Sequence, residues 1–252
     1  MSVPEHAQAP NVSQLNRDEI EHFHQQGWLG PYTSFSPAEM ADIRDRLETG
    51  LLGTPTVWGG SQYQTRHLDN RQVYDLCTHP AILDRVACLL GPDLVLWQSN
   101  FFLKEPGSKQ IPWHQDLAFW PIEPPLNISA WIAIDPVTVE NSCVRLLPGS
   151  HRTVVPHIPA TEEQAFPRQA DPTQFNPENV VDMVLQPGEF FLFTERLLHS
   201  SEANRSDKRR MGIAVRLTTP IVRCYHDHPM VVVRGQDLMK FNETTVPPAG
   251  DG

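Results

Sequence analysis

The spacing of apolar residues changes near residue 94, and this change constrains the fold more than any other feature of the sequence. Upstream, apolar residues recur at helical intervals, which predicts helices over residues 16–27, 36–47 and 80–90. Downstream, the period becomes two, which predicts strands over residues 94–104, 128–134, 180–185, 190–194 and 211–217. Helices followed by a series of strands predict a mainly β protein with flanking helices, built as a sandwich or a double-sheet jelly roll.

Proline content favours many short elements. The chain has 24 prolines in 252 residues, about twice the typical share of about 5%, and proline interrupts both helices and central strands. An all-helical bundle is therefore disfavoured. The polar segments at residues 1–15 and 244–252 are expected to be flexible tails, which leaves residues 16–243 as a single domain.

Net charge limits the partners of the chain. It carries 20 Lys and Arg against 30 Asp and Glu, a formal net charge of −10. Such a chain cannot neutralise a row of phosphates, so neither nucleic acid nor an anionic membrane surface is an expected partner. A small-molecule substrate is the expected partner, and the sequence carries no signal for the oligomeric state.

Targeting signals and cysteine usage predict a cytoplasmic protein. The start of the chain lacks the apolar core of a signal peptide, and no run approaches the roughly 18 apolar residues of a membrane span. The cysteines form no CxxC pair, which favours free thiols over disulfides or a zinc site. They are Cys77, Cys88, Cys143 and Cys224.

Three residues form a candidate metal site. His114 and Asp116 lie two positions apart, so in an extended segment both side chains project to the same side. His199 follows the apolar run 190–193 and supplies a third ligand. Two histidines and one carboxylate leave the other positions of a metal open, which is the arrangement of non-haem Fe(II) oxygenases. Zinc accepts the same ligand types.

Two further histidine motifs have similar spacing. His67 precedes Asp69 by two residues, and His226 and His228 flank Asp227. For both motifs a structural or solvated interpretation is favoured, because an isolated pair at this spacing is weak evidence for a metal.

A cationic strand face is the second candidate feature. The predicted strand over residues 211–217, together with the preceding residue 210, has one face with small and cationic side chains. This face carries Arg210, Gly212, Ala214 and Arg216. A buried arginine there can receive a carboxylate through paired N–H groups, and an ion pair within the fold is the alternative. Six residues at ~3.3 Å each place the two arginines about 20 Å apart, so only one lies close to the metal.

The predicted strand over residues 94–104 has a partly polar lining. Alternation divides it into two faces. One face carries Gln98, Asn100, Phe102 and Lys104. The other carries Trp97, Ser99, Phe101 and Leu103.

Four segments have a known counterpart. They are WQSNFFLK (97–104), PWHQDLAFW (112–120), PGSHR (148–152) and HSSEANRSDKRR (199–210). In this order they resemble the phytanoyl-CoA dioxygenase family, which includes ectoine hydroxylase and uses Fe(II) and 2-oxoglutarate on a double-stranded β-helix. The resemblance runs from about residue 18 to residue 237. It implies the double-stranded β-helix (jelly roll) as the fold.

The resemblance implies roles for individual residues. The iron ligands of the family fall on His114, Asp116 and His199. Its 2-oxoglutarate-binding residues fall on Arg210, Ser201 and Lys104. Its substrate contacts fall on Gln98 and Trp120, with Asn100 on the same strand face as Gln98, and core packing is the alternative for Trp120.

The chain departs from the family at two kinds of position. Many relatives read Glu-Asn-Gly-Cys where this chain has Ser142 in the third place. The segments 54–75 and 156–178, which should face the substrate, match no relative, so the substrate is not identified. Related halogenases carry a small residue in place of the carboxylate ligand, and the presence of Asp116 therefore favours hydroxylation.

The combined expectation is an Fe(II)- and 2-oxoglutarate-dependent dioxygenase. It should hydroxylate, or otherwise oxidise, a small polar or natural-product substrate with dioxygen and release succinate and CO2. A CoA ester is less favoured because a chain of net charge −10 offers no basic approach to the pocket. The alternatives are a zinc-dependent hydrolase and a non-catalytic jelly-roll ligand-binding module.

Overall fold

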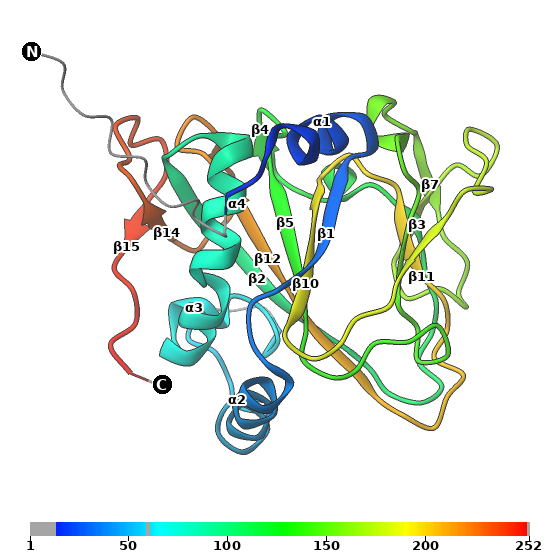
Figure 1. Cartoon of the computed structure of the whole chain (residues 1–252), viewed down its shortest axis with the longest axis horizontal. Coiled ribbons are helices and arrows are strands. Elements are labelled where there is room, and N and C mark those ends of the chain that lie inside the picture. The colour runs from blue at the N-terminus through cyan, green and yellow to red at the C-terminus, as the bar shows by residue number, and fades with distance from the viewer. Residues whose placement is uncertain (1–13, 59–60, 251–252) are drawn as a thin grey trace, which may run out of the picture.

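Two sheets, antiparallel except for one strand pair, form the body of the molecule in a computed structural model that describes residues 14–58 and 61–250 (Figure 1). The seven-stranded sheet runs β1 (Trp28–Thr33), β10 (Glu189–Thr194), β5 (Ile128–Ala133), β12 (Arg210–Thr218), β2 (Leu94–Lys104), β14 (Met230–Arg234) and β15 (Thr244–Thr245). The four-stranded sheet runs β3 (Ile111–His114), β11 (His199–Ser201), β6 (Val144–Leu146) and β9 (Val181–Met183). This is the predicted jelly roll.

Two pairs of short strands lie outside these sheets. They are β13 (Arg223–Cys224) with β4 (Ile122–Glu123), and β7 (His157–Pro159) with β8 (Arg168–Ala170). The final strand β15 pairs parallel with β14, and it lies inside the segment expected to be a C-terminal tail.

Four α-helices accompany the sheets in the described part of the chain. They are α1 (Arg17–Gln26), α2 (Pro37–Gly50), α3 (Arg71–Cys77) and α4 (Pro80–Leu90). Asn16 and Ser36 each begin a helix with a capping box that satisfies free backbone N–H groups. The three predicted helices are thereby confirmed, whereas α3, with only seven residues, was too short to be recognised.

Three short 3₁₀ turns complete the helical elements. They are η1 (Arg66–Leu68), η2 (Asp116–Ala118) and η3 (Ser150–Arg152).

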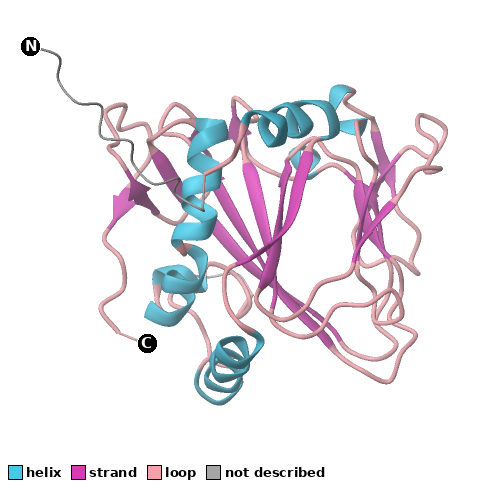
Figure 2. Cartoon of the chain, viewed as in Figure 1, coloured by secondary structure: helices cyan, strands magenta, loops and turns pink. Residues whose placement is uncertain are grey.

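The seven-stranded sheet separates two apolar cores. Figure 1 and Figure 2 show α3 and α4 against one side of this sheet, α1 across its upper end, and the four-stranded sheet on the other side. On the helical side, Met40, Ile82 and Leu96 belong to the larger core cluster. On the opposite side, Phe191 packs with Leu146 of the four-stranded sheet. The space between the sheets is therefore where a cavity can form beside a rigid core.

The side on which Trp97 lies was predicted wrongly. The pairing of β12 with β2 is regular from Arg210 to Arg216, which pairs with Gln98, and then shifts so that Leu217 pairs with Leu96. This β-bulge leaves Trp97 as the extra residue. Trp97 therefore joins Gln98 beside the cavity between the sheets, although strict alternation would place them on opposite faces.

The cysteines and the helix lengths bear on two further expectations. The four cysteines are free thiols, as predicted. Across residues 14–58 and 61–250, every helix is too short or too polar to cross a bilayer.

Candidate metal and cosubstrate site

The predicted metal ligands come together at the edge of the four-stranded sheet. His114 ends β3, His199 begins the neighbouring strand β11, and the two residues are paired across the sheet. Asp116 opens the turn η2 directly after β3. Its Oδ1 lies 3.6 Å from His114 Nε2 and 3.8 Å from His199 Nε2. These three atoms can bind one ion between them.

Backbone carbonyls orient both histidine rings. His114 Nδ1 lies 2.8 Å from the carbonyl oxygen of Pro112, and His199 Nδ1 lies 2.9 Å from that of Leu197. A carbonyl oxygen only accepts, so Nδ1 carries the proton in each ring. Both Nε2 atoms are therefore left as lone-pair donors for a metal, which is how ligating histidines are usually held.

Gln115 lies between His114 and Asp116, and its hydrogen bonds hold the backbone there in place. Its side-chain amide donates to the carbonyl oxygens of Thr153 and Arg196 and accepts from the backbone N–H of Val155. Its own backbone N–H donates to His157 Nε2 at 3.0 Å. The spacing of His114 and Asp116 is thus fixed from behind by buried hydrogen bonds.

The protonation states suit a metal site. Burial by itself would raise the pKa of Asp116, but the Arg216 guanidinium and the two imidazoles outweigh it and hold the pKa well below its usual range. Burial, reinforced by His114, lowers the pKa of His199 to about 3. At neutral pH the carboxylate is charged and this imidazole is neutral, as metal ligation requires.

The triad opens into a cavity of about 420 Å³ that extends along β12. One end, here called the Arg210 end, is lined by Phe102, Ile111, Trp131, Val144, Ser200, Ser201 and Arg210. The other, the Arg216 end, is lined by Trp97, Gln98, Trp120, Arg216, His226 and His228. Gln64 and Asn100 also line the cavity, and they lie near the middle of β12 because Asn100 pairs with Ala214. The predicted shared face of β12 is therefore confirmed, because both of its arginines line the cavity.

Arg210 is a buried cation without an anion. Its side chain is 1% exposed, and no carboxylate in the described residues forms an ion pair with it. Its Nε has no hydrogen-bond partner, and the guanidinium lies 5.1 Å from the Trp131 ring. Burial lowers its pKa to about 10, which leaves it charged at neutral pH. The alternative of an internal ion pair is not what the structure shows.

Gly212 makes this arrangement possible. A Cβ atom at Gly212 would lie 2.2 Å from the ring of Trp131, far inside van der Waals contact. Only a residue without a side chain lets Trp131 lie across the strand beside Arg210.

Arg216 is the arginine that lies close to the triad. Its Nη2 is 3.6 Å from Asp116 Oδ2, an atom with no hydrogen-bond partner. Its guanidinium lies 4.7 Å from the Trp120 ring and 6.0 Å from the Phe193 ring. Arg216 is thus held between aromatic faces beside Asp116, the carboxylate of the candidate triad.

The other two predicted cosubstrate residues differ in position. Ser201 lines the Arg210 end, and its buried hydroxyl has no partner. Lys104 is absent from the described lining of the cavity. Its ammonium donates to Ser142 Oγ at 2.8 Å and to the carbonyl oxygens of Ser201 and Glu202. Lys104 therefore contacts the segment that carries Ser201.

The departure at Ser142 bears on Lys104. Ser142 has a φ of 79°, a left-handed conformation that favours glycine. The serine retains this conformation and offers its hydroxyl to the Lys104 ammonium. Burial, then the charge of Arg210, lower the pKa of Lys104 to about 7.

The histidine motifs outside the triad have different surroundings. His67 is fully buried and its Nδ1 lies 2.8 Å from Ser99 Oγ, which is a structural position as favoured from the sequence. His226 and His228 line the cavity, a location that sequence reasoning missed. The sequence does show these two imidazoles two residues apart, but it does not show which elements pack against them in the fold.

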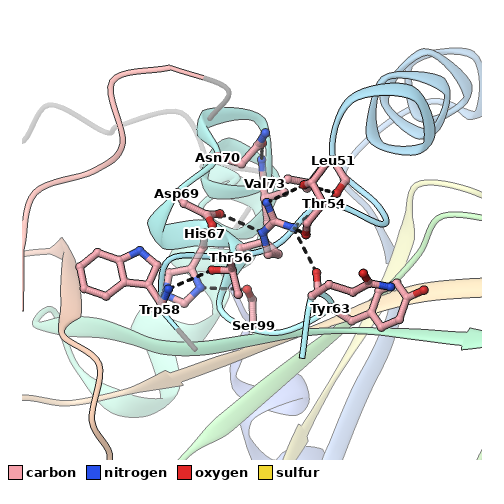
Figure 3. A network of polar contacts seen from close by, with 12 residues as sticks. Leu51, Thr54, Thr56, Trp58, Tyr63, His67, Asp69, Asn70, Val73 and Ser99 are labelled. Carbon is pink, nitrogen blue, oxygen red and sulfur yellow. Dashed lines mark hydrogen bonds and ion pairs between the residues drawn. The ribbon is translucent and has the colours of Figure 1, made fainter. Parts of the chain in front are cut away.

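A buried arginine holds the loop that brings Gln64 to the cavity. Arg66 donates to the carbonyl oxygens of Leu51, Thr54 and Gln62 and to the carboxylate of Asp69. Figure 3 shows this network beside the His67–Ser99 contact. The adjacent segment pairs with β2, because the Thr65 N–H donates to the Ser99 carbonyl oxygen. Gln64 forms a β-bridge with Asn100 in that pairing.

Comparisons with known proteins identify the relatives of this chain. The family model "Phytanoyl-CoA dioxygenase (PhyH)" matches residues 23–212. Dioxygenase lolE1 of Epichloe uncinata is 30% identical over 188 residues, which is 75% of this chain and 69% of that protein. Human peroxisomal phytanoyl-CoA dioxygenase is 29% identical over 58% of this chain, which spans only 46% of the human protein's length.

Comparison with solved structures finds a similar fold in a non-haem monooxygenase and in a protein solved with Fe(II) and α-ketoglutarate. The apo form of the non-haem monooxygenase ThoJ is 28% identical with a TM-score of 0.76, over 93% of this chain and 90% of that one. CytC3 with Fe(II) and α-ketoglutarate is 25% identical with a TM-score of 0.73, over 92% of this chain and 93% of that one.

Fold, triad and relatives define a non-haem iron dioxygenase of the 2-oxoglutarate-dependent class. The chain belongs to the phytanoyl-CoA dioxygenase family.

Proposed function

We propose that this enzyme hydroxylates a small polar or natural-product substrate, using Fe(II), 2-oxoglutarate and dioxygen and releasing succinate and CO2. The observation that carries the proposal is Arg210, a buried guanidinium without a carboxylate partner in the same cavity as the triad. A buried charge of this kind is costly unless a ligand supplies the opposite charge. A dicarboxylate cosubstrate supplies it.

The residues of the cavity fit both Fe(II) and 2-oxoglutarate. His114, His199 and Asp116 offer two imidazole nitrogens and a carboxylate oxygen, a donor set suited to Fe(II). The unpartnered Arg210 Nε and Ser201 hydroxyl fit the far carboxylate of 2-oxoglutarate. When bound, the iron supplies the activation of dioxygen, and the chain supplies ligation, positioning and exclusion of water.

Arg216 has a positioning role in this proposal. Asp116 Oδ1 faces the two histidines, while Oδ2 faces Arg216 Nη2. An arginine on Oδ2 leaves Asp116 a single oxygen for the metal, which keeps further coordination positions open. Trp120 and Phe193 hold the guanidinium in place.

Asp116 also bears on the outcome of the reaction. A charged carboxylate occupies the position that a small residue has in related halogenases, so chloride would have to displace a tethered anion. Hydroxylation is the expected outcome. Mass spectrometry of the product formed under ¹⁸O₂ with chloride present should show an added ¹⁸O atom, and a chlorinated product without oxygenation would contradict it.

The substrate should bind at the Arg216 end. The sequence candidates Gln98, Asn100 and Trp120 line the cavity, and the structure adds Gln64, His226 and His228. The side-chain amides provide hydrogen bonds to a polar molecule, and the rings provide apolar contact.

Succinate formation tests the proposed reaction. Purified protein with Fe(II), 2-oxoglutarate and air should form succinate, slowly alone and faster with the true substrate among amino acids, acyl-CoA esters and secondary metabolites. His199→Ala should abolish it. A zinc hydrolase or a non-catalytic binding module would form no succinate under any of these conditions.

A cytoplasmic location and a small-molecule partner complete the proposal. Four free thiols favour a reducing compartment. The net charge of −10 disfavours nucleic acid and anionic membranes. Fractionation of the native host with antibody detection tests the location, and recovery with membranes would contradict it.

A further inference from the structure

Four rings form one wall of the cavity at the Arg216 end, here called the substrate wall: Trp97, Trp120, His226 and His228. The rings of Trp97 and His226 are stacked, with centroids 5.7 Å apart and an interplanar angle of 9°. His226 and His228 are stacked at 3.8 Å and 15°. Trp120 meets Trp97 edge-on at 5.3 Å. Three parallel rings and one perpendicular ring give this end of the cavity an aromatic, polarisable lining.

The substrate wall is anchored in the sheet. Trp97 Nε1 donates to Asn127 Oδ1 at 2.7 Å, and the Asn127 amide donates to Ser129 Oγ. The Asn127 backbone N–H donates to Glu195 Oε2 at 3.1 Å. Trp97 is 1% exposed. A platform fixed in this way can orient a ligand without losing conformational entropy of its own.

Polar groups beside the substrate wall have unused hydrogen-bonding capacity. Both ring nitrogens of His226 are buried without a partner. Burial, then His228, lower the pKa of His226 to about 4, so its ring is neutral at pH 7. A neutral imidazole offers one donor and one acceptor. Because a buried unpaired group is costly, a ligand hydroxyl or carbonyl that reaches it gains affinity.

Cationic side chains outnumber carboxylates in the lining of the cavity. Among the described lining residues, Asp116 is the one carboxylate, and it is committed to the metal. Arg216 lies against Trp120 of the substrate wall, and its Nε and Nη1 have no hydrogen-bond partner. Fe(II) and the 2-oxoglutarate dianion cancel, so the loaded cavity retains the excess of two arginines over one carboxylate. The field there opposes a cation.

We propose that the substrate wall binds a planar ring compound that is neutral or anionic and carries hydroxyl, carbonyl or carboxylate groups, and that it rejects substrates bearing an ammonium group. This inference rests on the proposed function, because it assigns the substrate class of the same cavity. It separates oxygenated ring compounds from amines and amino acids as substrates.

Three probes with one ring and different charges test the proposal. Phenylacetate, 2-phenylethanol and phenethylamine carry −1, 0 and +1 charge at pH 7. Binding to the protein loaded with Ni(II) and 2-oxoglutarate is measured by saturation-transfer NMR and competition between the probes. Phenylacetate and 2-phenylethanol should bind at least about tenfold more tightly than phenethylamine. Equal or tighter binding of phenethylamine, or no binding of any probe at millimolar concentration, would overturn the proposal.

Paired variants locate the effect. His226→Ala should weaken the binding of 2-phenylethanol by about three- to tenfold, and His226→Phe, which restores the ring without its nitrogens, should recover only the part of that loss that comes from ring contact. Arg216→Met should bring the affinities for phenylacetate and phenethylamine together. Arg223→Met is the matched control, because Arg223 is an exposed cation of the nearby strand β13. An equal effect of Arg223→Met would remove Arg216 from the explanation.

The binding assay is separable from the proposed reaction. If the protein forms no succinate but still binds the probes in this order, the proposed function fails and the ligand class stands. If it forms succinate but prefers phenethylamine, the proposed function stands and the ligand class is wrong.

Discussion

Each end of β12 carries a buried arginine, but the two arginines have different partners. Arg210 has no carboxylate partner in the described chain, whereas Arg216 lies 3.6 Å from Asp116. Both residues share one strand face and line one cavity. In the proposed function, Arg210 is the charge that a bound carboxylate neutralises, and Arg216 is the charge that positions a metal ligand. Burial alone therefore does not assign an arginine a role, and its partner does.

Small residues between the arginines keep these roles apart. Gly212 and Ala214 occupy the same face, and Trp131, paired with Ala214, packs over Gly212 beside Arg210. The Trp131 ring thus belongs to the Arg210 end, while Trp120 covers Arg216. Each guanidinium has its own aromatic neighbour, and the triad lies beside the Arg216 end.

The largest effect is expected when a ligand of the candidate metal site is removed. His114→Ala or Asp116→Ala should lower Ni(II) or Fe(II) affinity by about 100-fold or more, with little change in folding, because the ligands meet in a cavity. Isothermal titration calorimetry and a thermal melt measure the two quantities. His67→Ala and His226→Ala should retain the metal. If either loses it while His114→Ala keeps it, the triad is wrongly assigned.

The next effect separates the two arginines. Arg210→Ala should raise the Kd for 2-oxoglutarate by about 100-fold, because a charge-assisted pair in a desolvated pocket is lost. Titration of the Ni(II)-loaded protein with 2-oxoglutarate gives the value. Arg216→Met should change this Kd by less than about threefold. An equal effect of both variants on this Kd would mean that 2-oxoglutarate contacts both arginines, and the distinction between the two ends would be wrong.

Arg216 should act on the metal instead. Arg216→Met should weaken metal binding by about tenfold, since Asp116 loses the partner of its second oxygen. Arg216→Lys, which keeps the charge, should recover part of the loss. A metal affinity unchanged in both variants would show that Arg216 does not position Asp116.

The smallest expected effect is a pH dependence at the Arg210 end. Burial and Arg210 lower the pKa of Lys104 to about 7, and a bound dianion favours the protonated form. The affinity for 2-oxoglutarate should therefore be highest below pH 7 and fall by about threefold as Lys104 loses its proton above it. Lys104→Met should flatten this profile, and Arg216→Met should leave its shape unchanged. A profile that rises with pH would contradict the assignment.

Long elements of this fold could be predicted from sequence, and short ones could not. The eleven residues of β2 and the nine of β12 give enough alternation to assign faces. The strands β3 and β11 have four and three residues, too few to show a period, yet they carry both histidine ligands. Those histidines were found through the motif around His114 and the resemblance, not through secondary structure.

Other features depended on tertiary structure. The bulge at Trp97 reverses the expected side of that residue, and nothing in the local pattern marks it. The contact of Arg216 with Asp116 joins residues 100 positions apart, so strand spacing could say that one arginine lies near the metal but not which one. His226 and His228 were assigned a structural or solvated role because no sequence signal places β14 and its preceding loop against β2.

The network around Arg66 bears on how an enzyme of this kind can change its substrate. One guanidinium donates to the carbonyl oxygens of Leu51, Thr54 and Gln62 and so holds these three positions together. Substitutions in the segment that contains these positions, next to Gln64, should alter the lining of the cavity and leave the sheet that carries the triad unchanged, because His114, Asp116 and His199 all lie outside the segment.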